Sequence, residues 1–171
     1  MQKYGLDYVL NMDETPCKIV ERPLSGWALG ASKNLRILTD GNTRQKITVI
    51  PTITAGGDKL NMAWIHKAET TKAISEMDNV PKNVLSYFSE SGWINSGIMM
   101  RCLREVVAPY VQKRKCALLI DSYEAHWTDE VKDLAKKMKV ELIKVPEGTT
   151  SELQPMDVHF NGPFKAARTK L

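Results

Sequence analysis

Three aspartates stand at the ends of predicted secondary-structure elements, and their chemistry suits a metal site. Asp13 follows a β-rich segment, Asp121 follows a strongly apolar one, and Asp157 stands at the start of the last predicted helix. Carboxylates that converge without basic partners repel one another, so such a cluster is stable chiefly when it holds a divalent cation. Oxygen donors of this kind suit Mg²⁺ or Mn²⁺. Two such ions roughly 3.5–4 Å apart can activate a water or hydroxyl and stabilise the leaving oxygen of a phosphodiester.

Asp121 is the member of this set whose surroundings the sequence defines best. Five apolar residues, 116–120, lead directly into it, and the basic residues 113–115 precede them. Such a run predicts a strand buried on both faces of a largely parallel sheet, and ligands bind such sheets at the carboxyl ends of their strands. A carboxylate in that place needs a cation or a hydrogen-bond donor beside it. Capping of the next helix, or pairing with a nearby lysine, would explain Asp121 equally well.

The rest of the chain predicts antiparallel strands first and helix–strand units afterwards. Residues 8–14 read as a strand that Thr15-Pro16 should stop, and residues 46–54 and 60–65 read as a hairpin with Pro51 at a bulge or an edge. Helices are expected from Asn95 or Ser96, limited or kinked by Pro109, and from Thr128, whose hydroxyl can cap the first turn. A strand over 140–145 and a final helix from about Pro155 follow. Residues 84–88 fit either a strand or a helix, 35–39 a short extended piece, and 67–82 an irregular segment.

This order of elements indicates an α/β fold in which the first strand and the Asp121 strand come together. Right-handed crossovers place the Asp121 strand beside the first strand or near it. Neighbouring strands lie about 4.8 Å apart. Asp13 and Asp121 could therefore meet in one site.

Composition favours a single globular domain. The chain has 171 residues, of which 43% are hydrophobic and 26% charged, which disfavours disordered, collagen-like and membrane classes. No secretory signal is visible, so we expect an intracellular protein or an excised fragment. Cys17, Cys102 and Cys116 are too widely spaced for a zinc site. The net charge is +4, with basic clusters at 113–115, 132–139 and 165–170 that either face a polyanion or form solvated helix faces.

Three blocks of this sequence resemble the DDE superfamily endonucleases, and most of all the pogo and mariner branch of transposases with its jerky and centromere protein B relatives. The blocks are Asn11-Met-Asp-Glu-Thr-Pro16, then Leu118-Leu-Ile-Asp-Ser122 with His126, and then Val145-Pro-Glu-Gly-Thr-Thr150 followed by Leu153-Gln-Pro-Met-Asp157. They occur in the family's order and extend over nearly the whole chain.

The resemblance implies a ribonuclease H-like fold, with a mixed five-stranded sheet flanked by helices in a single domain over residues 1–171. It also implies two Mg²⁺ or Mn²⁺ ions, cleavage of DNA and strand transfer. Carried over residue by residue, the catalytic triad and metal ligands fall on Asp13, Asp121 and Asp157. DNA phosphates as partner, a homodimer and a nuclear location belong to the same expectation, and residues 113–115 are a candidate for nuclear targeting or phosphate contact.

The sequence departs from the family in two respects. Ser122 stands where the family usually has Asn, and Tyr123-Glu124 replaces small or apolar residues, so an extra acid near the metals could weaken or redirect catalysis. The helix-turn-helix region that recognises transposon ends is absent from this chain. We therefore expect no site-specific DNA binding by it.

Several further residues have two readings. Glu14 should point to the opposite strand face from Asp13, which favours a salt bridge over metal ligation. His126 could orient a water or phosphate, or could hydrogen-bond at a helix entry, whereas His159 reads as a surface residue. Core packing is the better prediction for most of the tryptophans, namely Trp27, Trp64, Trp93 and Trp127.

The sequence thus leaves three functional hypotheses. The leading one is a metal-dependent endonuclease and strand-transfer core of a DNA transposase. A domesticated descendant could instead keep the fold as a DNA-associated or interaction module without catalysis. A ribonuclease H-like enzyme that acts on RNA would share the same metal site.

Overall fold

The computed structural model describes residues 3–18, 46–67 and 81–168. The expected extended piece at 35–39, most of the irregular segment over 67–82, Lys170 and Trp27 lie outside these ranges. Within them, no helix is long and apolar enough to cross a membrane.

In the described parts of the chain, eight strands form two four-stranded mixed sheets. The first sheet has the order β4 (Thr52–Thr54), β1 (Val9–Met12), β7 (Cys116–Ile120) and β8 (Val140–Lys144), with β1, β7 and β8 parallel and β4 antiparallel to β1. The second has the order β2 (Thr15–Lys18), β3 (Lys46–Ile50), β5 (Met62–Lys67) and β6 (Val84–Ser89). Only β5 and β6 are parallel in it.

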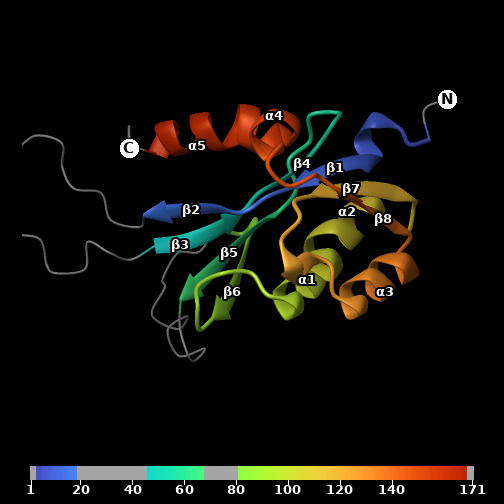
Figure 1. Ribbon diagram of the computed structural model, residues 1–171, viewed down its shortest axis with the longest axis horizontal. Coiled ribbons are helices and arrows are strands. Elements are labelled where there is room, and N and C mark those ends of the chain that lie inside the picture. The colour runs from blue at the N-terminus through green and yellow to red at the C-terminus, as the bar shows by residue number, and fades with distance from the viewer. Residues whose placement is uncertain (1–2, 19–45, 68–80, 169–171) are drawn as a thin grey trace, which may run out of the picture.

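The two sheets are joined by two continuous runs of chain (Figure 1). Strand β1 passes through Asp13 and Glu14 into β2, and β3 passes through Pro51 into β4. At this break the amide of Asp13 donates a 3.4 Å hydrogen bond to the Pro51 carbonyl. The ladder is thus interrupted at Pro51, as expected for a residue that cannot donate to it, and the interruption lies directly beside the candidate acids.

Two expectations about strands were wrong. Thr15-Pro16 does not stop the first strand, because the chain continues as β2. Strand β2 lies at the edge of its sheet, where a proline is tolerated. The predicted single sheet of five strands is instead divided into two sheets of four. The extended runs β1–β2 and β3–β4 each contribute one strand to either sheet, and the undecided residues 84–88 lie in the edge strand β6.

The helices begin where the caps predict. Asn95 accepts a 2.9 Å hydrogen bond from the Ile98 amide at the start of α1 (Ser96–Cys102), and Thr128 accepts from Val131 at the start of α3 (Asp129–Lys137). Pro109 does not end its helix: α1 continues through a π turn, Leu103–Val107, into α2 (Ala108–Val111). A wider turn beside a proline re-satisfies backbone groups that a regular helix would leave unpaired.

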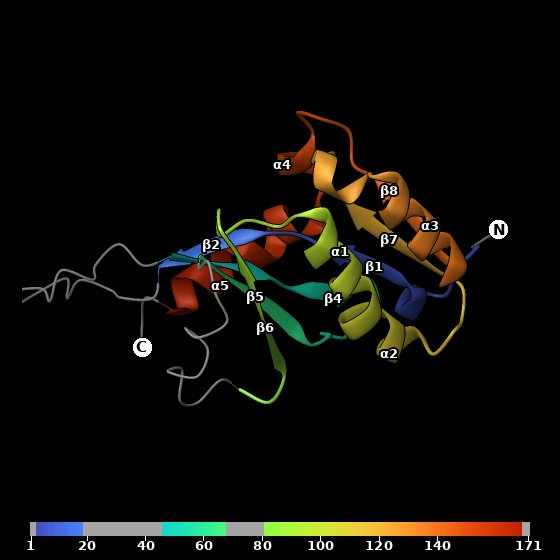
Figure 2. The same cartoon turned by 90° about the horizontal axis from the view of Figure 1, so that it is seen from below.

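Helices cover both faces of the sheets. In Figures 1 and 2, α1, α2 and α3 lie on one face and α5 (Asn161–Arg168) on the other. The larger core, between the sheets and the first helix group, includes Leu10, Tyr87, Met99, Leu118 and Val131. The smaller core packs Phe164 of α5 against Cys17, Ile47 and Val49. The α/β architecture is therefore as predicted.

One buried amide connects three elements around the candidate site. The Asn11 side chain donates to the Leu119 carbonyl of β7 at 3.1 Å and accepts from the Met156 amide at 2.9 Å. Met156 begins η5 (Met156–Phe160), the π turn that follows the short helix α4 (Thr150–Leu153) and leads into α5. Asn11 therefore fixes where the Asp157 segment meets the sheet.

We expect Asn11→Ala to lower the free energy of unfolding by roughly 2–4 kcal/mol, because each buried group left without a partner costs about 1–3 kcal/mol. Urea denaturation followed by circular dichroism measures the change. The exposed Asn83→Ala is the matched control and should stay within about 0.5 kcal/mol of wild type. Equal stability of the two variants would contradict the linking role of Asn11.

Candidate metal-binding acidic site

Strand register brings Asp13 and Asp121 to the same level of the sheet. In the parallel ladder, Leu10 pairs with Leu118 and Asn11 with Leu119. Asp13 follows β1 by one residue, and Asp121 follows β7 by one residue, so the two acids leave adjacent strands side by side. The prediction that they lie on neighbouring strands is confirmed.

Asp121 forms a compact group with Glu14 and His126. His126 Nδ1 lies 2.8 Å from Asp121 Oδ1, and His126 Nε2 lies 3.0 Å from Glu14 Oε1. One ligand atom of each residue lies within 4.8 Å of the others, so this group could hold a metal ion. The salt bridge expected for Glu14 is confirmed, and it is made inside the acidic site.

The loop after β7 is shaped around Asp121. The Tyr123 amide donates to Asp121 Oδ1 at 3.1 Å, and the Trp127 indole Nε1 donates to the Asp121 carbonyl at 2.8 Å. The intervening 3₁₀ turn, Glu124–His126, carries the His126 ring back over the strand end. Both the backbone and the side chain of Asp121 are therefore fixed by residues of the loop that follows it.

Asp13 has different neighbours, on the C-terminal segment. Gln154 Nε2 donates to Asp13 Oδ1 and Asn161 Nδ2 donates to Asp13 Oδ2, both at 2.7 Å. The same Asn161 nitrogen lies 3.1 Å from Asp157 Oδ1. One amide therefore bridges Asp13 and Asp157. The structure places Asp157 in η5, close to the predicted helix start, but links it to Asp13 rather than directly to Asp121.

Gln154 and Asn161 were not predicted as site residues from the sequence. Their signal is spacing: Gln154, Asp157 and Asn161 are three and four residues apart, which places them on one face of a helical segment. Gln154 and Asn161 are buried, and buried polar groups of this kind require partners.

The charges of the site are strongly perturbed. Burial raises the pKa of Asp13 to about 7, despite the Asn161 hydrogen bond, and nearby Asp157 adds to the rise. Burial acts in the same direction on Asp121, but the His126 and Tyr123 contacts outweigh it and hold the pKa of Asp121 below its usual value. Burial lowers the pKa of His126, whereas Asp121 and Glu14 raise it to about 9 in net effect. In the absence of metal, His126 is therefore the cation of the site.

The donor set fits a divalent cation. Carboxylate oxygens and an imidazole nitrogen suit Mg²⁺ or Mn²⁺, and the resistance of buried Asp13 to ionisation is the property that a nearby cation would reverse. His126 would need to lose its proton to act as a ligand. The carboxylates alone suffice for an oxygen site, with His126 positioning Asp121.

Other expected residues fall as follows. His159 is exposed, as predicted, and Glu124 is exposed on the outside of its turn. Trp64 and Trp127 are half-buried against the cores, whereas Trp93 is 50% exposed. Core packing thus holds for two of the three tryptophans that the structure describes, in line with the prediction for most of them. Trp93 lies in the loop before α1, where its backbone carbonyl accepts from Ser89.

Without metal, the fold should lose stability as pH rises. The folded pKa of Asp13, about 7, lies above its ordinary value of 3.8, so its stabilising contribution is complete below pH 4 and lost up to pH 7. That of His126, about 9, lies above 6.5, so its contribution is complete below pH 6.5 and lost up to pH 9. In EDTA the free energy of unfolding should fall by about 1.4 kcal/mol per pH unit within each window. Thermal melts across the pH range measure this loss.

Two variants test which residue causes the loss of stability in each pH window. His126→Gln should flatten the alkaline fall and Asp13→Asn the acidic one, while the exposed His159→Gln should leave the profile unchanged. A wild-type melting temperature that is constant in EDTA from pH 5 to pH 9 would contradict the perturbed charges.

Comparisons with known proteins identify the family and the fold. The family model described as "DDE superfamily endonuclease" matches residues 44–169, which include Asp121 and Asp157 but not Asp13. The human protein "Pogo transposable element with KRAB domain" is 29% identical over 160 residues, and its mouse counterpart is 28% identical. Each alignment covers 91% of this chain and 25% of the relative, so the chain spans about a quarter of the length of these proteins.

Solved structures with the same fold come from a mariner transposase. The "Mos1 transposase paired-end complex with left transposon end" aligns with a TM-score of 0.61 at 12% identity, over 97% of this chain and 43% of that one. The "Mos1 mariner paired end complex with Mn" gives 0.61 at 14% identity, over 97% and 44%. The Mos1 transposase catalytic domain gives 0.54 at 13% identity, over 99% and 65%. The predicted ribonuclease H-like fold is thereby confirmed, and the chain belongs to the DDE superfamily endonucleases.

Proposed function

We propose that this chain is the catalytic core of a DNA transposase, which cleaves and joins DNA strands with two divalent metal ions. The observation that supports it most is the placement of Asp13 and Asp121 side by side where two adjacent parallel strands end. Asp157 is joined to Asp13 through Asn161. Family membership and similarity to a transposase complex with Mn point to the same chemistry.

In this proposal Asp13, Asp121 and Asp157 hold the ions. Bound Mg²⁺ or Mn²⁺ would supply activation of the attacking water or hydroxyl and stabilisation of the leaving oxygen. The other residues act on the carboxylates. Gln154 and Asn161 fix both oxygens of Asp13, whereas the Tyr123 amide and His126 fix Asp121. These contacts orient the acids before metal binds, which reduces the cost of assembling the site.

A second function, a domesticated module without catalysis, is supported by a specific observation. Protonated His126 lies between Glu14 and Asp121 and already neutralises part of the acidic site without metal. A chain that had lost catalysis could keep this ion pair as a structural element. The two functions therefore differ in whether a divalent cation enters the site.

The proposal also covers the binding partner. We expect contacts with DNA phosphates that are largely independent of sequence, because phosphate contacts carry no base information. A nuclear location and a homodimer complete the proposal, and fractionation and analytical ultracentrifugation of the full protein test them.

Divalent metal should raise the melting temperature of the wild-type protein. Binding to the folded state relieves carboxylate repulsion and shifts unfolding by mass action, by about 2.7 kcal/mol at a metal concentration of 100 Kd. Asp121→Asn should reduce this shift, whereas Asp129→Asn, at an exposed helix position, should retain it. Thermal melts at several Mn²⁺ concentrations measure the effect. An unchanged shift in Asp121→Asn would exclude Asp121 as a ligand.

Catalysis is tested with a supercoiled plasmid in Mn²⁺. Wild type should nick it, Asp157→Ala should lose nicking but keep metal-free DNA binding, and Asp129→Ala should behave as wild type. RNA and RNA–DNA hybrid substrates, measured in parallel, separate a ribonuclease from a transposase core. If wild type nicks no better than Asp157→Ala, the catalytic proposal fails and the domesticated module takes its place.

A further inference from the structure

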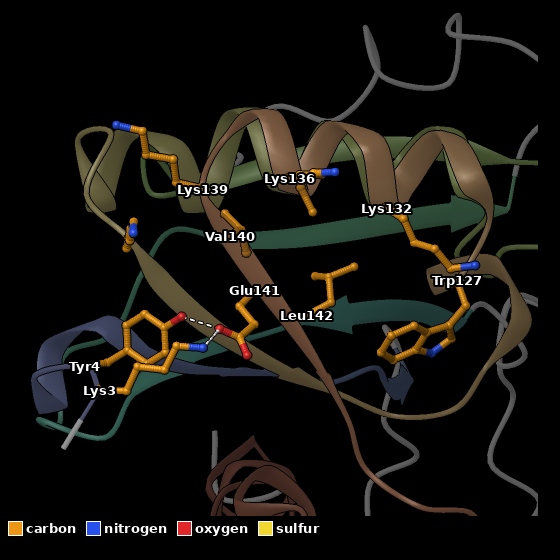
Figure 3. A pocket seen from close by; sticks show the side chains of 11 residues that line it. Lys3, Tyr4, Trp127, Lys132, Lys136, Lys139, Val140, Glu141 and Leu142 are labelled. Carbon is orange, nitrogen blue, oxygen red and sulfur yellow. Dashed lines mark hydrogen bonds and ion pairs between the residues drawn. The ribbon is translucent and has the colours of Figure 1, made fainter. Parts of the chain in front are cut away.

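A basic hollow of about 540 Å³ lies between α3 and the edge strand β8 (Figure 3). Five lysines line it: Lys3, Lys115, Lys132, Lys136 and Lys139. They come from the N-terminus, from the residue before β7 and from α3 with the turn after it. Two of the basic clusters noticed in the sequence thus meet at one surface in the folded chain.

Acidic side chains pair with two of these five lysines. Glu141 faces the hollow but is held by Lys3 and the Tyr4 hydroxyl. Asp129 pairs with Lys132 at 3.3 Å on the exposed side of α3. In the part of the chain that the structure describes, Lys115, Lys136 and Lys139 form no ion pair. Gathered lysines without carboxylate partners attract a polyanion.

Aromatic rings stand at the two ends of the hollow. Figure 3 shows Tyr4 beside Lys3 at one end and Trp127 beside Lys132 at the other, with the aliphatic Val140 and Leu142 between them. Lysines that can follow a phosphate backbone, combined with rings on which bases can stack, form the usual binding surface for single-stranded nucleic acid. An acidic peptide would use the lysines but has no need of the rings.

The hollow is connected to the acidic site by one side chain. Trp127 lines it and also donates its indole N–H to the Asp121 carbonyl at 2.8 Å. A strand that stacks on Trp127 would therefore contact the side chain that holds the Asp121 backbone. The volume of the hollow lies in the range of pockets that hold small ligands. It suits individual nucleotides of a flexible strand rather than a duplex.

We infer that this basic hollow, the groove between α3 and β8, binds a short single-stranded DNA segment. The lysines contact its phosphates, and a base stacks on Trp127. This inference deepens the proposed function, on which it rests for DNA as the substrate, by naming a second contact surface outside the metal site. Binding here requires no metal. It can therefore be measured in EDTA, where failure of catalysis has no influence.

The test is fluorescence anisotropy of a labelled oligothymidylate of about twelve nucleotides, in EDTA, at several salt concentrations. Each phosphate contact on a single strand contributes about −0.7 to the slope of log K against log salt. Lys132→Gln/Lys136→Gln should flatten the slope by about 1.4 and weaken binding several-fold. Lys59→Gln/Lys137→Gln, which removes equal charge from exposed positions outside the groove, should change neither value.

Tryptophan fluorescence reports stacking. Oligothymidylate should quench it in wild type and in Trp93→Phe, but much less in Trp127→Phe. Equal slopes for the two lysine double variants, or equal quenching in the two tryptophan variants, would overturn the inference. So would stronger competition for the groove by a duplex, by ATP or by polyglutamate than by unlabelled oligothymidylate. If the wild-type protein nicks the plasmid but does not bind oligothymidylate at the groove, this inference alone fails and the proposed function stands.

Discussion

The parallel ladder between β1 and β7 is the constraint on which the candidate site depends. It sets residues 13 and 121 side by side, and the sheet is divided immediately beyond them, where Asp13 donates to Pro51 instead of continuing a regular ladder. An uninterrupted sheet would pair these backbones further and leave less room for side chains to converge. The helices on both faces and the buried core keep this ladder in register, since a slip of one residue would turn every side chain to the other face.

The acids of the site are held by two kinds of partner. Asp13 receives neutral amide donors, which orient it but do little to offset the cost of burying its charge, so its pKa is raised. Asp121 receives a cationic imidazole and a backbone amide, so its pKa is lowered. Near neutral pH without metal, Asp13 is therefore partly protonated, whereas Asp121 is ionised. A divalent cation would remove this difference, because it favours the charged form of both.

Local patterns predicted most of the elements, while contacts distant in sequence were beyond reach. The apolar run before Asp121, the caps at Asn95 and Thr128 and the strand over 140–145 depend on neighbouring residues, and all are present. The prediction that Pro16 stops a strand was wrong because the effect of a proline depends on whether its strand lies at an edge. That position is a tertiary property. Gln154 and Asn161 were missed for the same reason: their partner Asp13 lies more than a hundred residues away along the chain. The family resemblance correctly indicated the fold, and the roles of its three aspartates stay a prediction.

The departures at residues 122–124 are less disruptive than their chemistry suggests. Asp121 uses the backbone N–H of Tyr123, which any residue except proline supplies, and the Tyr123 side chain is 49% exposed with its ring edge-on to His126. Glu124 begins the 3₁₀ turn and its side chain is exposed, so it adds no carboxylate to the group of Glu14, Asp121 and His126. The feature that bears most on metal binding is therefore His126. Its positive charge competes with a cation for the Asp121 carboxylate, and deprotonation at higher pH would favour the metal.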